Sequence, residues 1–283
     1  GCDIDVIDAL TLAKLVTPGD KTNASGFYEV IVPNGNFEMH FQPPVASNLA
    51  SLIKTGIHVG QDTVVNAGVQ SGVLLQGTVQ SGTGGLVDAC DIDLFNSSTQ
   101  ASVLAAGDKT NFNGTYQMVV LTNTYDLEFE APKSRRLRAK RITAQSVGAP
   151  QTLNVTLDSG LSVSGVITGS GSPVANVNVD AIIESSGLNT FQPGDQSSAS
   201  GSYEVIVDFV PHTLAFFPPV STGFAARKYT GVNPGADFIH NVTLNSGFLV
   251  QGTATQVGGS AASGVTLRAE ATGVWVPTSE GVS

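Results

Sequence analysis

The chain has 283 residues, of which 41% are hydrophobic and only 13% are charged, and its formal net charge is −10. This acidic balance argues against nucleic acid as the main partner, because phosphate contacts require clustered cations. No run of about 18 apolar residues is present, so the sequence predicts no membrane span.

Three segments of the chain repeat one pattern. Residues 19–32, 107–120 and 194–207 each start with Gly-Asp and contain a glycine that is followed two positions later by tyrosine. The segments are 88 and 87 residues apart. A fixed period of this size indicates a tandem array of small, similar domains.

Ser-Gly pairs at residues 71, 159 and 246 have the same period and set the predicted boundaries. We therefore expect four parts. They are a module lacking its opening strand (1–70), two complete modules (71–158 and 159–245) and a partial module with opening strands (246–283).

The second module predicts about seven short strands in fewer than ninety residues. Apolar residues alternate with polar ones, which is the period of a half-buried strand, and Asn113-Gly114 is typical of a tight turn. Such a series of strands is typical of a β-sandwich, so we predict an all-β array of sandwich modules. The main expected strands are 73–80, 90–94, 116–120, 125–129, 137–142 and 153–157.

Two residue types recur at equivalent positions of the modules. Tyr28, Tyr116 and Tyr203 share one position and are expected to lie in the core. Cys2 and Cys90 share another, and sites a whole module apart are too distant for a disulfide. We expect both cysteines to be small buried hydrophobic residues, with lipidation of Cys2 as the alternative.

The order of these elements resembles the carboxypeptidase regulatory-like domain. The similar motifs are the opening strand at 75–79, Thr-Asn-X-X-Gly-X-Tyr at 110–116 and Tyr-X-Leu-X-Phe at 125–129. This resemblance implies a seven-stranded transthyretin-like sandwich that serves as a spacer, adhesive repeat or accessory domain. At the position where that family usually has an Asp after the Thr, this chain has Asn23, Asn111 and Ser198.

Paired acidic residues are weak candidates for a calcium site. Asp3 and Asp5, and likewise Asp91 and Asp93, place two carboxylates on one face of a strand. Calcium takes six to eight oxygen ligands, so each pair would need a partner segment. The alternative is a solvated outer face, and we predict no obligatory cofactor.

A basic cluster interrupts the acidic background in the second module. Its alternating positions predict a basic ridge facing solvent. This ridge could bind an acidic surface of another copy or an anionic glycan, or it could protect a solvated edge against strand pairing. The basic cluster consists of Lys133, Arg135, Arg136, Arg138, Lys140 and Arg141.

Catalytic patterns are not found in the sequence. The four histidines occupy four different positions of the repeat, and the serines lie in glycine-rich turns without a nucleophile elbow. We therefore predict that the protein is not an enzyme.

The incomplete first and last parts suggest a function. A sandwich without its opening strand exposes unpaired backbone groups, which another strand can pair. We expect an extracellular or cell-surface structural protein, such as a filament, stalk or surface-layer subunit. In this hypothesis residues 246–263 complete module 1 of the next copy, giving a head-to-tail homopolymer. The alternative is an adhesive or glycan-binding accessory array of a larger secreted surface protein.

Overall fold

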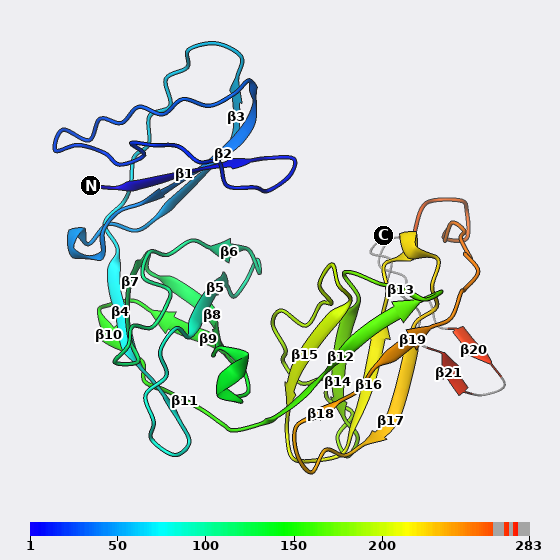
Figure 1. Ribbon diagram of the computed structural model, residues 1–283. Coiled ribbons are helices and arrows are strands. Elements are labelled where there is room, and N and C mark those ends of the chain that lie inside the picture. Colours follow the sequence, from blue (N-terminus) through cyan, green and yellow to red (C-terminus); the bar gives the residue numbers. More distant parts are fainter. Residues whose placement is uncertain (263–268, 272–273, 277–283) are drawn as a thin grey trace. The chain divides into compact units, whose positions relative to one another are not determined.

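The structure, a computed structural model, describes residues 1–262, 269–271 and 274–276 (Figure 1). The described regular structure consists of β-strands and three short 3-10 turns, which confirms the predicted all-β class. Two compact units are present, and each is described separately. The first contains Gly1–Pro132 and Lys140–Leu157, and the second contains Lys133–Ala139 and the described residues from Asp158 onward.

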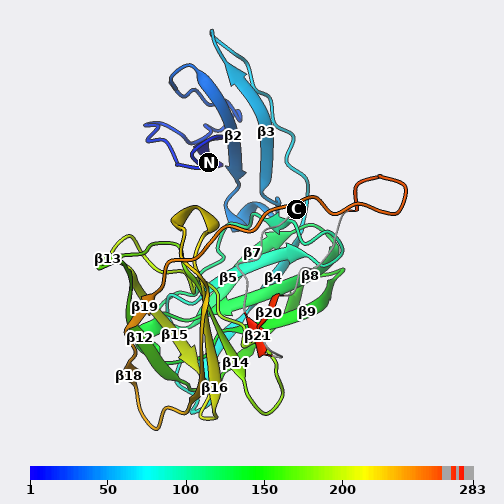
Figure 2. The ribbon, with the colours of Figure 1, turned by 90° about the vertical axis from the view of Figure 1, so that its right-hand side faces the viewer.

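Module 1 contains one antiparallel sheet with the order β1-β2-β3. Strands β2 and β3 lie side by side in both views of the ribbon (Figures 1 and 2). The hydrophobic core cluster of this module consists of Ile4, Val6, Phe37, Met39 and Phe41. The elements are β1 (Asp3–Asp8), β2 (Gly35–Gln42), the 3-10 turn η1 (Val45–Ser47) and β3 (Leu52–Val59).

The second module has two sheets. In the first, β4 pairs antiparallel with β7 on one edge and parallel with β10 and β11 on the other. The second sheet has the order β6-β5-β8-β9. The strands are β4 (Val73–Ser81), β5 (Asp91–Asn96), β6 (Ser102–Val103), β7 (Thr115–Val120), β8 (Asn123–Glu130), β9 (Lys140–Val147), β10 (Gln151–Thr152) and β11 (Val155–Leu157).

The third module repeats this plan within the second unit. Here β12 pairs with β15 on one edge and with β18 and β19 on the other, while β14, β16 and β17 form the facing sheet. The elements of the second unit are η2 (Lys133–Arg135), β12 (Leu161–Gly169), β13 (Ser172–Pro173), β14 (Asn178–Ile183), β15 (Ser202–Val207), β16 (His212–Phe217), η3 (Val220–Thr222), β17 (Arg227–Val232), β18 (Phe238–Ile239), β19 (Val242–Leu244), β20 (Ala269–Ala271) and β21 (Val274–Val276).

Most strands expected in the second module are confirmed, with three differences. In place of the strand expected at 153–157 there are two short strands, β10 and β11, and residues 153–154 belong to neither. The strand expected at 137–142 begins only at Lys140, because Leu137 forms an isolated bridge with Ser159 in the second unit. The strand β8 does not alternate between buried and exposed residues, because its polar residues Asp126 and Glu128 are buried as well. The number and the boundaries of the repeats stay predictions.

The two cysteines are free, as expected from their positions in the repeat. Cys90 is fully buried, and burial raises the pKa of its thiol to about 12. Cys2 is only half-buried, which corrects the expectation that both are core residues. Its position lies in module 1, whose core is less enclosed.

Candidate functional site

The central strand of each complete module closes the module's core. The buried side chains of β7 and β11, such as Tyr116, Met118 and Leu157, lie on either side of β4. In the third module Tyr203 and Leu244 are likewise buried on either side of β12. The central strand therefore forms backbone hydrogen bonds with both neighbouring strands and shields the core from solvent.

Module 1 has the two edges without a strand between them. Residues 27–32 correspond to β7, and residues 63–69 correspond to β10 and β11, by the repeat period. Neither segment is a strand in the structure, and both are drawn as plain trace in Figure 1. We call these two segments, residues 27–32 and 63–69, together the acceptor groove.

Side chains along the acceptor groove alternate between half-buried and exposed. The half-buried ones pack against the module core. Most of their counterparts in the complete modules are buried, but Leu153 and His240, the counterparts of Val65, are half-buried as well. Within the described part of the chain, the backbone of residues 28–32 and 63–69 forms no backbone–backbone hydrogen bond. The acceptor groove therefore has the pattern of a sandwich edge whose ladder is unformed. Its half-buried side chains are Tyr28, Val30, Val32, Val65, Ala67 and Val69.

A tyrosine links the two sides of the acceptor groove. The hydroxyl of Tyr28 donates to the carbonyl of Val65 at 2.6 Å. In the complete modules Tyr116 donates in the same way to Leu153 at 2.7 Å, and Tyr203 donates to the carbonyl 37 residues further on at 2.6 Å. The acceptor groove thus already contains the bond that joins its two edges in the complete modules, even without the central strand.

A segment with the complementary features follows β19. Residues 246–256, which we call the donor tail, correspond to β4 and β12 by the repeat period. Phe248 and Val250 are 99% and 92% exposed, and no described backbone hydrogen bond involves residues 248–253. In Figure 1 this segment carries no strand arrow. Residue 263 of the expected 246–263 segment lies outside the described residues.

The conformation around the donor tail matches the other repeats. At its start, Phe224 and Ser246 form an isolated bridge, as Leu137 and Ser159 do one module earlier. At its end, Ala262 N–H donates to the carbonyl of Ala254 at 3.0 Å, which is the contact that follows β4 in the second module. The contacts at the two ends of the donor tail are therefore those found at the ends of an opening strand.

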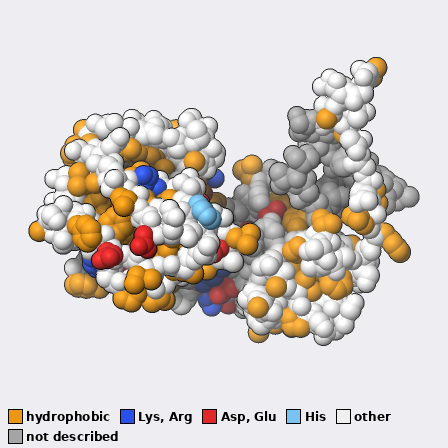
Figure 3. Space-filling view, turned by 90° about the horizontal axis from the view of Figure 1, so that it is seen from above, with side chains coloured by type: hydrophobic (Ala, Val, Ile, Leu, Met, Phe, Trp, Pro, Cys, Tyr) orange, Lys and Arg blue, Asp and Glu red, His pale blue; other side chains and the backbone are white. Residues whose placement is uncertain are grey.

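Exposed hydrophobic side chains are not confined to the donor tail. They reach the surface at many points in the space-filling view (Figure 3). Exposure alone therefore does not identify a binding site. The donor tail differs from these other places in two ways. The backbone of residues 248–253 forms no described hydrogen bond, and the segment corresponds to the central strands β4 and β12.

The basic cluster makes contacts within the chain. Arg136 forms ion pairs with Glu204 at 2.8 Å and with Asp237 at 2.7 Å. Arg138 forms ion pairs with Asp208 at 2.9 Å and with Asp158 at 3.3 Å. Both arginines thus face carboxylates of the second unit, which corrects the expectation that they form a ridge facing solvent.

The remaining cationic residues also contact their own unit. The Lys133 ammonium donates to the carbonyls of Gly194 and Glu204 at 2.9 and 2.8 Å, and the Lys140 ammonium donates to the carbonyl of Thr156 at 3.2 Å. Arg135 is exposed. Binding of a separate partner by this cluster stays a prediction.

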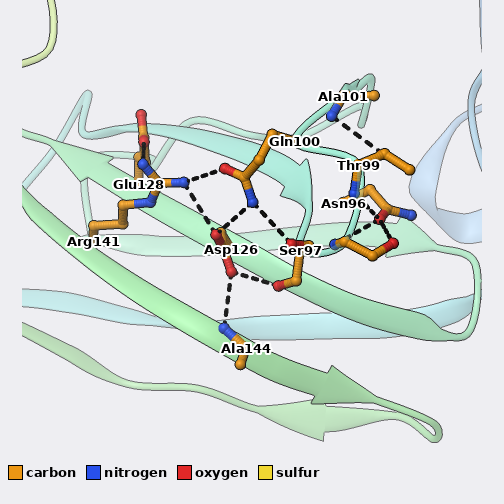
Figure 4. A network of polar contacts seen from close by, with 10 residues as sticks. Asn96, Ser97, Thr99, Gln100, Ala101, Asp126, Glu128, Arg141 and Ala144 are labelled. Atoms are coloured by element: carbon orange, nitrogen blue, oxygen red, sulfur yellow. Dashed lines mark hydrogen bonds and ion pairs between the residues drawn. The ribbon is translucent and has the colours of Figure 1, made fainter. Parts of the chain in front are cut away.

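Arg141 belongs to a polar network around Asp126 (Figure 4). The Asp126 carboxylate accepts hydrogen bonds from the Ser97 hydroxyl, the Ala144 N–H and the side chains of Gln100 and Arg141. These bonds, led by that from Ser97, lower the pKa of Asp126 well below its usual range. The network fixes the bulge where β8 and β9 change register, which is a structural role.

The acidic pairs have lysine partners in the structure. Asp5 lies 2.5 Å from the Lys14 ammonium, and Asp91 lies 3.3 Å from that of Lys109. Asp3 lies 3.8 Å from the Lys21 ammonium. Asp5 is only 9% exposed, which contradicts a fully solvated face.

The other member of the second pair, Asp93, has its carboxyl pKa raised by burial and by the nearby Asp91. Within residues 1–262, 269–271 and 274–276, no group of three or more His, Cys, Asp or Glu side chains is placed to hold a metal ion. Calcium binding by these pairs stays a prediction. The same described residues contain no helix long and apolar enough to cross a membrane.

Comparisons with known proteins give no family. No protein-family model matches the chain, and no curated protein matches it. Among solved structures, the chain is similar to the TIE protein of Bacillus anthracis, with 12% identity over 87% of this chain, and a TM-score of 0.27. The chain spans 48% of the length of that protein.

Two pilins are also among the similar structures. The shaft pilin SpaA of Lactobacillus rhamnosus GG is 10% identical over 64% of this chain and 100% of its own, with a TM-score of 0.28. A streptococcal ancillary pilin is 12% identical over 78% of this chain and 79% of its own, with a TM-score of 0.27. These values are too low to support an argument about fold or function.

Proposed function

We propose that this chain is an extracellular structural protein that assembles head to tail, with the donor tail of one copy occupying the acceptor groove of the next. The observation that carries this proposal is the match between a groove lacking its central strand and an exposed segment with the sequence of that strand. In the described chain, residues 28–32, 63–69 and 248–253 form no backbone–backbone hydrogen bond, and their apolar side chains are half-buried or exposed.

Insertion would form what the complete modules already contain. A strand in the acceptor groove pairs with backbone groups on both sides and covers the half-buried side chains of residues 27–32 and 63–69. Each ladder hydrogen bond contributes on the order of 1 kcal/mol, and burial of apolar surface adds about 25 cal/mol per Å². Insertion of the strand would therefore pair exposed backbone groups and bury exposed apolar side chains in one contact.

The geometry of such a contact favours a polymer. The donor tail and the acceptor groove are different surfaces of the chain, so the interface is heterologous, and a heterologous contact that does not close into a ring grows a filament. An array of β-sandwich modules joined in this way is suited to a filament, stalk or surface layer. The extracellular location follows from this role and belongs to the proposal.

The alternative role, an adhesive or glycan-binding array, depends on the basic cluster. Its arginines face carboxylates of their own unit, which reduces the positive charge available to an anionic glycan. We therefore place assembly first and glycan binding second.

A charge placed in the donor tail tests the proposal in the full chain. Val250 is 92% exposed, so Val250→Asp leaves the free subunit intact but places a charge in the core of a completed module. Val257, which is also fully exposed, lies beyond the ladder and provides the control Val257→Asp. Light scattering and negative-stain electron microscopy should find polymers of the wild type and of Val257→Asp, and monomers of Val250→Asp.

Two results would contradict the proposal. The wild type could stay monomeric at every concentration, or Val250→Asp could form the same polymers as the wild type. In the second case assembly uses a surface other than the donor tail.

A further inference from the structure

The central strand of each complete module contains a glycine that has no space for a side chain. A Cβ at Gly77 would lie 1.9 Å from the carbonyl oxygen of Leu153, and a Cβ at Gly165 would lie 2.2 Å from that of His240. Neither glycine has a positive φ, so the backbone conformation itself would accept alanine. Close approach of a carbonyl is therefore the reason for glycine at this position.

The repeated tyrosine positions that carbonyl. Gly77 is paired with Tyr116 in the ladder, and the Tyr116 hydroxyl donates to Leu153, whose carbonyl points at the glycine. The next residue, Asn154, accepts the N–H of Thr78 at 3.0 Å through its side-chain oxygen. Glycine, tyrosine and asparagine thus form one docking point between the central strand and its two neighbours.

The third module has the same docking point. Gly165 pairs with Tyr203, whose hydroxyl donates to His240, and the side chain of Asn241 accepts the N–H of Val166 at 3.0 Å. Two modules with different sequences use one geometry. The glycine therefore marks the register in which a central strand enters a module.

Both halves of this docking point occur separately in the acceptor groove and the donor tail. Tyr28 donates to Val65, and Asn66 follows, as the tyrosine and asparagine do in the complete modules. Gly252 is the glycine of the donor tail, 87 positions after Gly165. A Cβ on Gly252 would meet no atom within 4 Å in the free chain. Among the described residues, no neighbouring atom therefore requires glycine at position 252.

We infer, resting on the proposed function, that a second copy's donor tail enters the acceptor groove in one register, with Gly252 opposite Tyr28 and against the carbonyl of Val65. In this register the side chain of Asn66 accepts the N–H of Thr253. Phe248, Val250 and Ala254 then face the core, as Val73, Leu75 and Val79 of β4 do.

Other registers are disfavoured by two separate effects. A shift by one residue turns Leu249, Gln251 and Thr253 toward the core, and it turns Phe248, Val250 and Ala254 toward solvent. A shift by two residues keeps the apolar face inward but places Val250 or Ala254 against the carbonyl of Val65. Gly252 is therefore the residue of the donor tail that selects the register.

Substitution of Gly252 in the full chain tests this inference. Gly252→Ala adds one methyl group at the carbonyl contact and changes nothing in the free subunit. Thr253→Val is the matched control, because Val166 occupies the equivalent outward position in the third module. Overpacking of this kind should raise the concentration needed for half-maximal assembly about tenfold or more in Gly252→Ala. Thr253→Val should change it by less than about twofold.

The outcomes separate this inference from the proposed function. If Gly252→Ala assembles like the wild type while Val250→Asp does not, the donor tail joins copies but the glycine register is wrong. If Val250→Asp also assembles, the proposed function fails as well. A loss of assembly in Gly252→Ala, with Thr253→Val unaffected, supports both.

Discussion

Alanine at Gly77 should destabilise the second module strongly, although glycine in a strand is normally the less stable residue. The new Cβ would lie 1.9 Å from the Leu153 carbonyl oxygen, 2.7 Å from its carbonyl carbon and 3.0 Å from the Tyr116 ring. The nearest atoms are backbone, so relief requires the chain at residues 153–154 to move away. That movement breaks the hydrogen bonds that Tyr116 and Asn154 make at this point.

The expected cost follows from these contacts. Overpacking costs about 1–3 kcal/mol, and two lost hydrogen bonds add about 1 kcal/mol each. Alanine offsets about 0.5–1 kcal/mol of this through its lower backbone entropy in the unfolded state. The net destabilisation for Gly77→Ala is therefore about 2 to 4 kcal/mol, which corresponds to a shift of about 1–2 M in the urea midpoint.

Urea unfolding of the first unit can be followed in a Cys2→Ala background through Cys90, whose buried thiol should react with a thiol reagent only when its surroundings open. Gly148→Ala is the control, because a Cβ there meets no atom within 4 Å. Its midpoint should match that of the wild type. A Gly77→Ala midpoint equal to that of Gly148→Ala would refute the close-approach explanation, and with it the reasoning applied to Gly252.

Three further predictions concern charge and thiol chemistry. Arg136→Ala removes two partly exposed ion pairs and should destabilise the second unit by about 1 kcal/mol, a difference that shrinks in high salt; a difference unchanged in high salt would contradict it. The pKa of Asp195 is raised to about 6 by burial and by Asp180, so the folded state favours the protonated carboxyl. Its contribution to the free energy of unfolding is therefore complete below about pH 4 and is lost as pH rises through 6. Asp195→Asn should remove this part of the pH dependence of unfolding, and an unchanged profile would count against the assignment. A thiol reagent at pH 8 should modify Cys2 before Cys90, because Cys90 is fully buried; equal rates would contradict the burial.

The all-β fold could be predicted because each repeat shows the alternation of apolar and polar residues and the turn residues that define its strands. The alternation of Tyr116, Met118 and Val120 identifies one buried face, and all three are buried in β7. The turn at Asn113-Gly114 is also present, and Gly114 has a φ of 67°, which glycine adopts readily. Both features are local, so they can be read from neighbouring residues.

Features that depend on distant partners were missed. The alternation in β8 predicts that Asp126 faces solvent, whereas it is buried by hydrogen bonds from Ser97, Gln100 and Arg141. Its position opposite a bulge could have drawn attention, but the bulge residue Ala144 gives no sequence signal. Arg136 pairs with a carboxylate 101 residues away, and no pattern of spacing predicts such a pair.

The candidate site could be predicted in outline only. The repeat period shows that residues 1–70 contain no segment matching 71–88 and that residues 246–263 match it. The link between Tyr28 and Val65, and the reason for glycine at position 252, depend on a carbonyl position that only coordinates supply.

Cysteine cross-linking between two different variants tests strand exchange between copies most directly. In a Cys2→Ala background, Glu29→Cys chains are mixed with Gln251→Cys chains, since these two positions are directly opposite in the inferred register. Oxidation should link one chain of each kind, while Ile31→Cys chains, two residues out of register, should link much less with the same partner. Equal linking of both, or none in the Glu29→Cys mixture, would contradict insertion of one copy's tail into the groove of another.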